Sequence, residues 1–254
     1  VDKVSPNAPT IAYSGEGFEW LTTDQTVTIT YPSDAVIKEY CNYNGCYEYT
    51  GPLTVSGYET ITARAYDLAG NVSQDAYIEI TNVDKSYDGS EPYMDLSTWD
   101  MTSSNVMVTL YESLFNEMNS DSIWYSLSGG SDWSKYESPF EVSDNIEIQA
   151  YATDKAGNMS PIMTQYITNI DREAPEAPIL IPNTTDITDQ DVSVWYSNNS
   201  YDVSYTEYSY DGSSWYTFDS DLIITENITV YARSTDYAGN ISETSSLDIT
   251  NIQR

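Results

Sequence analysis

The chain has no histidine and only two cysteines among its 254 residues. Without an imidazole, the Ser-His and Cys-His arrangements that activate a nucleophile are unavailable. Two thiolates alone do not complete a tetrahedral zinc site. Carboxylate pairs remain for glycoside hydrolysis, but the small repeats described below offer little concavity for a catalytic cleft. We therefore expect that the chain is not an enzyme.

Basic residues are scarce as well. Nine Lys and Arg stand against forty Asp and Glu, which gives a formal net charge of -31. Nucleic acid and anionic membrane surfaces are therefore poor partners, because both need clustered positive charge. No run of 18 apolar residues is present, so we expect no membrane insertion.

Aromatic residues, by contrast, are abundant. The chain carries 24 tyrosines and six tryptophans, and its hydrophobic content is 40%. Disorder requires too little apolar surface to offset the entropy of the chain. The composition therefore predicts a folded protein.

A seven-residue phrase recurs three times, and each copy is followed after a strand-like stretch by a closing phrase of the type Ile-Thr-Asn. The copies are Asp67-Leu-Ala-Gly-Asn-Val-Ser73, Asp154-Lys-Ala-Gly-Asn-Met-Ser160 and Asp236-Tyr-Ala-Gly-Asn-Ile-Ser242. Their spacings, 87 residues (67 to 154) and 82 residues (154 to 236), suit a small sandwich domain better than a solenoid. Val1-Asp-Lys3 resembles the end of a closing phrase, which predicts that the chain was cut from a longer array.

Within a repeat the hydrophobic period is two. Val192, Val194 and Tyr196 alternate with other residues, and turn signals such as Asn44-Gly45 and Asp211-Gly212 separate the strand-like runs. Only Tyr111 to Asn119 departs from this pattern. The sequence predicts an all-β protein of three tandem immunoglobulin-like β-sandwich domains with about seven strands each. The predicted domains are residues 1–82, 83–169 and 170–254.

The two cysteines flank a hairpin turn. Cys41 and Cys46 enclose Asn42-Tyr-Asn-Gly45, so antiparallel pairing brings their Cβ atoms close to disulfide distance. We expect a Cys41–Cys46 disulfide, worth about 2 kcal/mol for so short a loop. A disulfide implies an oxidising compartment.

The recurring Asp-x-Ala-Gly-Asn predicts a tight turn, because Asp accepts hydrogen bonds from nearby N–H groups and Gly and Asn tolerate positive φ. The alternative is calcium, which prefers six to eight oxygen ligands. In the sandwich topology this loop points back to the start of its own domain, beside the linker. The candidate calcium ligands at the two junctions are Asp84, Asp154 and Asn158, and Asp171, Asp236 and Asn240.

The tryptophans fall into two groups. Trp133 and Trp215 each follow a glycine turn and precede another ring by three residues, and Cys46 takes that position in the first repeat. We expect these two rings to be buried in the core, where they would anchor the two sheets to each other. The others break the repeat and are candidates for stacking against sugars; they are Trp20, Trp99, Trp124 and Trp195. We select Trp20, Trp99 and Trp195 as ligand-binding residues.

Two phrases of the third repeat precede its copy of the signature, Tyr208-Ser-Tyr-Asp-Gly-Ser-Ser-Trp215 and Ile228-Thr-Val-Tyr-Ala-Arg233. Together with the signature they resemble the bacterial Ig-like repeats of large secreted and wall-anchored proteins, including OmpL47-type domains and the sandwich modules of some glycoside hydrolases. The resemblance implies a non-catalytic module without a shared active site.

We therefore expect an extracellular spacer or stalk of a bacterial surface or secreted protein, such as an adhesin. The expected cofactors are none, or calcium at the domain junctions. The alternative is a module that binds a carbohydrate or a host surface protein as the accessory of a secreted enzyme. Neighbouring domains of the same chain are the remaining expected partners.

Overall fold

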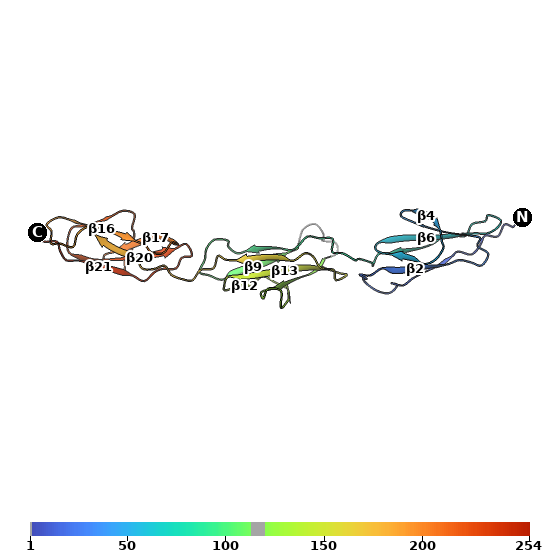
Figure 1. The fold of residues 1–254 in the computed structure, drawn as a ribbon, viewed down its shortest axis with the longest axis horizontal. Helices are drawn as coiled ribbons and strands as arrows, with labels where there is room; N and C mark the ends of the chain where they lie inside the picture. Colours follow the sequence, from blue (N-terminus) through green and yellow to red (C-terminus); the bar gives the residue numbers. More distant parts are fainter. Residues whose placement is uncertain (1, 113–119) are drawn as a thin grey trace. The chain divides into compact units, whose positions relative to one another are not determined.

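The computed structural model describes residues 2–112 and 120–254. Within these ranges the chain forms 21 strands in six small antiparallel sheets, and no helix (Figure 1). Each repeat contributes seven strands, so the predicted all-β class and strand number are confirmed. Residues 113–119, which make up most of the irregular stretch noted in the sequence, lie outside the described residues.

The first repeat forms a three-stranded sheet of order β1-β2-β5 and a four-stranded sheet of order β4-β3-β6-β7. The chain returns to the first sheet at β5 after the β3–β4 hairpin, as in immunoglobulin-like sandwiches. The strands are β1 (Thr10–Tyr13), β2 (Gln25–Thr30), β3 (Ile37–Asn42), β4 (Gly45–Glu48), β5 (Leu53–Val55), β6 (Glu59–Tyr66) and β7 (Ala76–Ile80).

The other two repeats have the same pair of strand orders, β8-β9-β12 with β11-β10-β13-β14 and β15-β16-β19 with β18-β17-β20-β21. The strands of the middle repeat are β8 (Tyr93–Leu96), β9 (Val106–Tyr111), β10 (Ser120–Ser126), β11 (Ser134–Lys135), β12 (Phe140–Val142), β13 (Ile146–Asp154) and β14 (Met163–Ile167). Those of the third repeat are β15 (Ile179–Pro182), β16 (Val192–Ser197), β17 (Val203–Ser209), β18 (Tyr216–Thr217), β19 (Leu222–Ile224), β20 (Ile228–Asp236) and β21 (Ser245–Ile249).

Alternation along the strands places one face of each sheet in a core. In the first repeat, Val27 of β2 and Ile61 and Ala63 of β6 are almost fully buried in one cluster. The third repeat repeats this arrangement with Val194 of β16 and Val230 of β20. Each of these two repeats therefore encloses a hydrophobic core between its own two sheets.

The closing phrases pin the last strand of each repeat to the loop before its second strand. Leu21 pairs with Val83 in a parallel bridge, and Thr102 with Ile170 and Thr188 with Ile252 do the same. The asparagine of each phrase donates from Nδ2 to two carbonyl oxygens of the opposite loop; for Asn169 these belong to Thr98 and Asp100, at 3.1 and 2.9 Å. The Ile-Thr-Asn phrase thus recurs because it locks the end of the fold.

The basic residue that ends each closing phrase extends this lock. Lys85 forms an ion pair with Asp24 at 2.5 Å, and Arg254 pairs with Asp191. In the middle repeat Arg172 donates to Asn105 Oδ1 at 2.6 Å instead. The Lys85 hydrogen bond holds the pKa of Asp24 below its usual value.

The chain divides into two compact units. The first comprises Val1–Tyr93, Leu110–Glu137 and Gln149–Thr164, and the second comprises Met94–Thr109, Ser138–Ile148 and Gln165–Arg254. The first and third repeats each lie within one unit, whereas the middle repeat contributes strands to both. The predicted domain boundaries at 83 and 170 fall between strands, although Val83 still packs into the first core.

Candidate functional site

The Asp-x-Ala-Gly-Asn signature forms the same turn in all three repeats, at the end of β6, β13 and β20. In the third repeat the Asp236 carboxylate accepts hydrogen bonds from Asn240, from the backbone N at 2.8 Å and from Nδ2 at 2.9 Å. Gly239 has a φ of 88°, the left-handed conformation that glycine adopts without strain. The turn predicted from the sequence is confirmed.

The asparagine of this turn also contacts the segment that precedes its own repeat. Asn240 Nδ2 donates to the carbonyl oxygen of Asp171 at 3.0 Å, and Asn158 Nδ2 donates to that of Asp84 at 3.1 Å. Asn71 makes the matching contact with the carbonyl oxygen of Asp2 at 3.3 Å. We call these contacts the seams; they place the turn beside the linker, as the sequence predicts.

Carboxylates gather at the seam before the third repeat. One oxygen each from Asp171, Asp202 and Asp236 lies within 4.8 Å of the other two. Asp236 is 3% exposed, Asp171 is half-buried and Asp202 is exposed. Sequence reasoning found Asp171 and Asp236 but missed Asp202, which ends the loop before β17 and accepts a hydrogen bond at its carbonyl from the Tyr237 N–H.

The seam before the middle repeat holds a looser group. Burial raises the pKa of Asp84, and the nearby carboxylates of Asp154 and Asp88 raise it further. Within the described part of the chain, Asp84 and Asp154 belong to no set of three metal-compatible ligands. Ahead of the first repeat, Asp2, Asp34 and Asp67 line one pocket of about 390 Å³.

Of the three selected tryptophans, Trp20 alone lines a described pocket. This pocket, of about 420 Å³, is also lined by Tyr58, Asp84, Lys85 and Asp88. Trp99 is 57% exposed and Trp195 is 38% exposed. Trp195 follows the buried Val194 on β16, so alternation turns its ring away from the core.

Trp133 and Trp215 do not anchor the space between the sheets, contrary to the sequence-based prediction. Both are half-buried on the outer face of the four-stranded sheets. Trp133 packs edge-on against Tyr151 at 4.6 Å, and the guanidinium of Arg233 lies 4.1 Å from the Trp215 ring. The prediction failed because a ring's size does not reveal which face of a strand carries it.

In the first and third repeats the ring three residues later takes the core position instead. Phe218 is 4% exposed and packs against Tyr196 at 4.6 Å between centroids. Tyr49 packs against the core of the first repeat, and its hydroxyl oxygen accepts a hydrogen bond from the Ile29 N–H at 3.0 Å.

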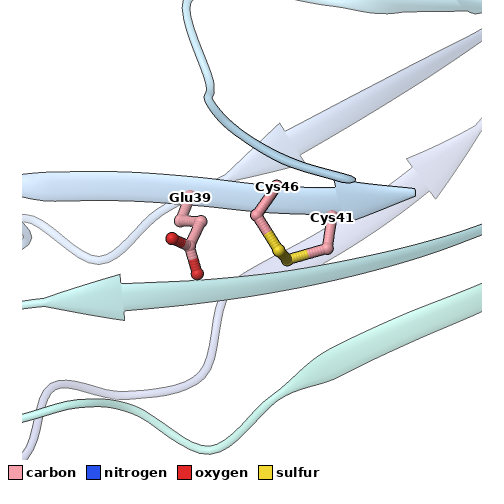
Figure 2. Close-up of side chains that lie close together, drawn as sticks. All are labelled: Glu39, Cys41 and Cys46. Atoms are coloured by element: carbon pink, nitrogen blue, oxygen red, sulfur yellow. A yellow bond between two sulfur atoms is a disulfide. The ribbon is translucent and has the colours of Figure 1, made fainter. Parts of the chain in front are cut away.

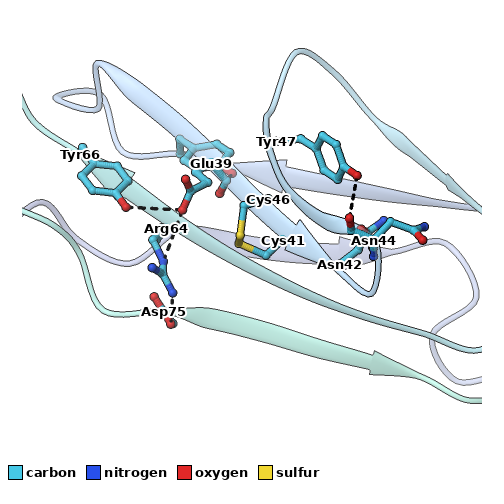
Figure 3. Close-up of a disulfide and its surroundings, with 10 residues drawn as sticks. Glu39, Cys41, Asn42, Asn44, Cys46, Tyr47, Arg64, Tyr66 and Asp75 are labelled. Atoms are coloured by element: carbon cyan, nitrogen blue, oxygen red, sulfur yellow. Dashed lines mark hydrogen bonds and ion pairs between the residues drawn. A yellow bond between two sulfur atoms is a disulfide. The ribbon is translucent and has the colours of Figure 1, made fainter.

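The predicted disulfide joins β3 and β4 (Figures 2 and 3). Cys41 and Cys46 lie directly opposite one another in the ladder, with their Cα atoms 3.9 Å apart. Glu39 brings a carboxylate near both sulfurs (Figure 2), but the sulfurs are bonded to each other and offer no thiolate to a metal. The disulfide occupies the position at which the other repeats carry tryptophan.

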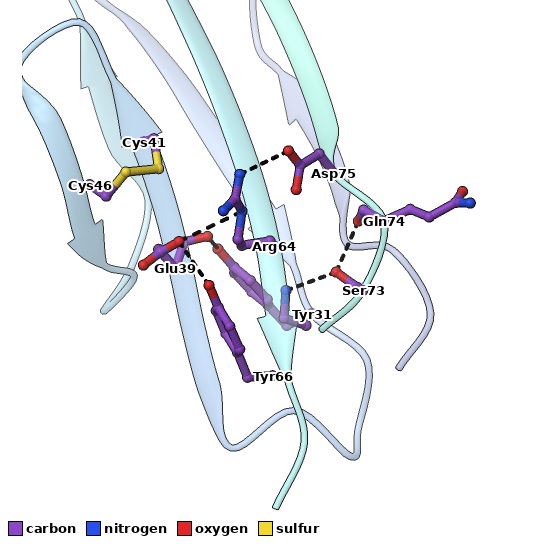
Figure 4. Close-up of polar contacts among 10 residues, drawn as sticks. Tyr31, Glu39, Cys41, Cys46, Arg64, Tyr66, Ser73, Gln74 and Asp75 are labelled. Atoms are coloured by element: carbon purple, nitrogen blue, oxygen red, sulfur yellow. Dashed lines mark hydrogen bonds and ion pairs between the residues drawn. A yellow bond between two sulfur atoms is a disulfide. The ribbon is translucent and has the colours of Figure 1, made fainter. Parts of the chain in front are cut away.

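Beside the disulfide runs a polar network on the same outer face (Figure 4). Arg64 donates to Asp75 at 2.9 Å and pairs with Glu39 at 3.7 Å. The backbone carbonyl of Glu39 accepts a hydrogen bond from the Tyr31 hydroxyl at 2.6 Å, and burial holds the pKa of Tyr31 well above its usual value. The third repeat has a matching ion pair, Arg233 with Glu207 at 2.9 Å.

No family model and no curated protein matches the sequence. One similar solved structure comes from a 1.5-MDa bacterial ice-binding adhesin, with 13% identity, a TM-score of 0.49 and coverage of 98% of each chain. The FN1–FN3 domains of chicken CNTN1 match at 11% identity, with a TM-score of 0.30 and coverage of 98% of this chain and 99% of theirs.

Fibronectin(III)-like modules of Clostridium thermocellum CbhA match at 12% identity and a TM-score of 0.29, over 63% of this chain and 94% of theirs. At this level of similarity the three matches assign no role to the chain. Within the described residues no helix is long and apolar enough to cross a membrane. By its own strand order and cores, the chain is an array of immunoglobulin-like β-sandwich repeats.

Proposed function

We propose that this chain is a non-catalytic, extracellular spacer region of a bacterial surface or secreted multidomain protein. One observation carries the proposal: the residues shared by all three repeats serve the fold and the seams. The signature asparagines bind the preceding linker, and the closing phrases lock each repeat. The Cys41–Cys46 disulfide supports an oxidising, extracellular location.

A spacer transmits position, so its repeats must hold a preferred relative orientation. We suggest attaching dyes to single cysteines in the first and third repeats of a Cys41→Ser, Cys46→Ser background and measuring the distance distribution by single-molecule energy transfer. The expected result is a narrow distribution that broadens in Asn158→Ala and Asn240→Ala, which lose the seam hydrogen bonds. Asn199→Ala, an exposed change in the third repeat, is the control.

A distribution as broad as that of a flexible linker, unaltered by either seam variant, would contradict the spacer role. Circular dichroism and urea unfolding of each variant separate this outcome from a loss of folding. Each substitution also removes the Nδ2 hydrogen bond to the aspartate of the turn, but the backbone N–H bond to that aspartate remains, so we expect the repeats themselves to stay folded.

We further propose calcium as the ion that stiffens the seams. The support is the set of three carboxylates at the last seam, Asp171, Asp202 and Asp236. Carboxylates this close repel one another, and calcium favours oxygen ligands in flexible arrangements. The chain's large acidic excess favours bound cations as well. Asn158 and Asn240 remain candidate ligands through their Oδ1 atoms, because their Nδ2 atoms already donate to the linker.

The second candidate function is recognition of a glycan or a host surface protein, and the Trp20 pocket is the observation that favours it. Trp20 and Tyr58 supply aromatic surface, and Asp84 and Asp88 supply hydrogen-bond acceptors in the same pocket. A glycan array with the whole chain tests this function. A hit that Trp20→Ala abolishes would support it, and a hit that survives the substitution would remove this pocket from consideration.

A further inference from the structure

The middle repeat differs from its neighbours at one position on the outer face of its four-stranded sheet. In the first and third repeats, two directly opposed residues on the central strands form an ion pair. The middle repeat places a tryptophan opposite a tyrosine at the matching positions. The opposed pairs are Glu39 and Arg64, Trp124 and Tyr151, and Glu207 and Arg233.

The aromatic pair belongs to a larger aromatic and basic surface. Trp124 and Tyr151 line a pocket of about 470 Å³ together with Lys135, Lys155 and Met159. Trp133 packs edge-on against Tyr151 with the ring centroids 4.6 Å apart, which fixes the tyrosine ring. All these residues lie within one compact unit, so the pocket does not depend on how the units are arranged.

The two lysines are unusual in this chain, which has only nine basic residues. Lys135 and Lys155 are exposed, and neither forms an ion pair within the residues that the structure describes. Lys85, by contrast, is paired with an aspartate. Two ammonium groups therefore line this pocket without an ion-pair partner among residues 2–112 and 120–254.

Two carboxylates also line the pocket. Asp154 is 5% exposed, and its oxygens accept hydrogen bonds from the Asn158 N–H and Nδ2 of the signature turn. Asp121 is exposed and accepts a hydrogen bond from the Ser122 hydroxyl at 2.7 Å. Both oxygens of Asp154 accept hydrogen bonds within the turn, whereas no ion pair engages either lysine among the described residues.

We propose that this surface binds an acidic saccharide, a sugar that carries a carboxylate. The apolar face of a sugar ring packs on the indole of Trp124, and the sugar carboxylate pairs with Lys135 or Lys155. Charge complementarity selects the acidic over the neutral sugar, because neither ammonium group has an ion-pair partner among the described residues. The screening length is about 8 Å at physiological salt, so the carboxylates outside the pocket act weakly on a bound anion, and the charges that line it, Lys135, Lys155, Asp121 and Asp154, decide its binding. The site goes beyond the spacer role and does not depend on it.

Isothermal titration calorimetry of the whole chain with trigalacturonate tests the proposal. The methyl ester of the same trisaccharide is the control ligand, because it keeps the rings and removes the charge. We expect trigalacturonate to bind and its ester to bind at least about tenfold more weakly, since charge-assisted hydrogen bonds are the stronger ones. The affinity for trigalacturonate should fall as salt is raised. No binding, or equal binding of the ester, would overturn the proposal.

The repeats supply a matched variant. Trp124→Glu combined with Tyr151→Arg installs the ion pair of the first and third repeats, which that sheet position accommodates. We expect this double variant to lose at least about tenfold in affinity, the range of a lost stacking contact. Lys135→Gln with Lys155→Gln should weaken binding and flatten its salt dependence. Trp215→Ala, on the matching face of the third repeat, should leave the affinity unchanged.

Unchanged affinity in the Trp124→Glu, Tyr151→Arg variant would overturn the assignment to this surface, and so would loss of binding in Trp215→Ala. Circular dichroism confirms that each variant is folded. These outcomes are independent of the energy-transfer test of the spacer, because they read ligand affinity and not the orientation of the repeats.

Discussion

Each polar residue of the recurring signature has a separate task. Asp236 accepts both donors of Asn240 and thereby closes the turn, and Asn240 carries the contact with the linker. Ser242 accepts at its Oγ a hydrogen bond from the Ser234 N–H at 2.9 Å. In the first and middle repeats the matching serines, Ser73 and Ser160, do the same. The signature therefore recurs because its aspartate closes the turn, its asparagine contacts the preceding segment, and its serine bonds to the neighbouring strand.

The closing-phrase asparagine gives a prediction on stability. Asn251→Ala removes the Nδ2 donor that two carbonyl oxygens, those of Thr184 and Asp186, now share. We expect the free energy of unfolding of the third repeat to fall by about 1–3 kcal/mol, the usual cost of such a loss. Urea unfolding measures it. Asn199→Ala, an exposed change in the same repeat, should stay within about 0.5 kcal/mol; equal losses in both variants would refute the lock.

Asp211 gives a prediction on pH. Hydrogen bonds from the N–H groups of Ser214 and Ser213, and from the hydroxyls of Ser214 and Ser209, hold its pKa well below the usual value. A lowered folded-state pKa means that the stabilisation is complete above the unfolded pKa of about 3.9 and is lost as the pH falls below it. Thermal unfolding of Asp211→Asn should therefore depend less on pH between about 4 and 2 than wild type.

The control for this experiment is Asp221→Asn, an exposed aspartate of the same repeat. Its pH dependence should match that of the wild type. An identical acid dependence in wild type and Asp211→Asn would show that the four donors around Asp211 do not stabilise the fold.

At the scale of elements, the hairpin of the four-stranded sheet is where the repeats diverge. The first repeat joins β3 to β4 by a disulfide, whereas in the third repeat Trp215, just before β18, lies beneath the guanidinium of Arg233. The sequence predicted the disulfide, because the hairpin turn and the cysteine spacing are both local. It did not predict that the position lies on the outer face, because the face depends on the register of the whole sheet.

The next prediction replaces the disulfide of the first repeat with the tryptophan that the third repeat carries at this position. Cys41→Ser with Cys46→Ala should destabilise the first repeat by about 2 kcal/mol, because the unfolded loop is no longer closed. Cys41→Ser with Cys46→Trp should recover part of this loss, since Arg64 matches the position of Arg233 and can stack on the new ring.

Urea unfolding of both variants gives the comparison, with reduced wild type as the reference. If the tryptophan variant is no more stable than the alanine variant, the disulfide and the tryptophan are not interchangeable supports of this hairpin. A wild type whose stability is unchanged by reductant would contradict the stabilising role of the Cys41–Cys46 bond itself.

For the whole molecule, the seams are the points at which each repeat contacts the segment that precedes it. If calcium binds there, excess calcium should raise the free energy of unfolding by about 2.7 kcal/mol at one hundred times the dissociation constant. Chelator should reverse the rise. Asp202→Asn, which removes one of the three clustered carboxylates without touching the signature turn, should reduce the calcium effect.

Differential scanning calorimetry in calcium and in chelator measures this effect, with Asp221→Asn as the control that retains it. Identical melting curves in the two conditions would remove calcium from the seams. The spacer proposal would survive that result, because the seam hydrogen bonds of Asn158 and Asn240 need no metal.

The sequence by itself determined the all-β class, the three repeats, the signature turn and the disulfide, because each depends on local periodicity, turn chemistry or short spacing. Only the tertiary structure decided which residues share a site. It brought Asp202 to Asp171 and Asp236, turned Trp133 and Trp215 to the outer face, and gathered Trp124, Tyr151 and two lysines around one pocket. These groupings join residues from separate strands, and strand register, which no single stretch of sequence encodes, sets which of them meet.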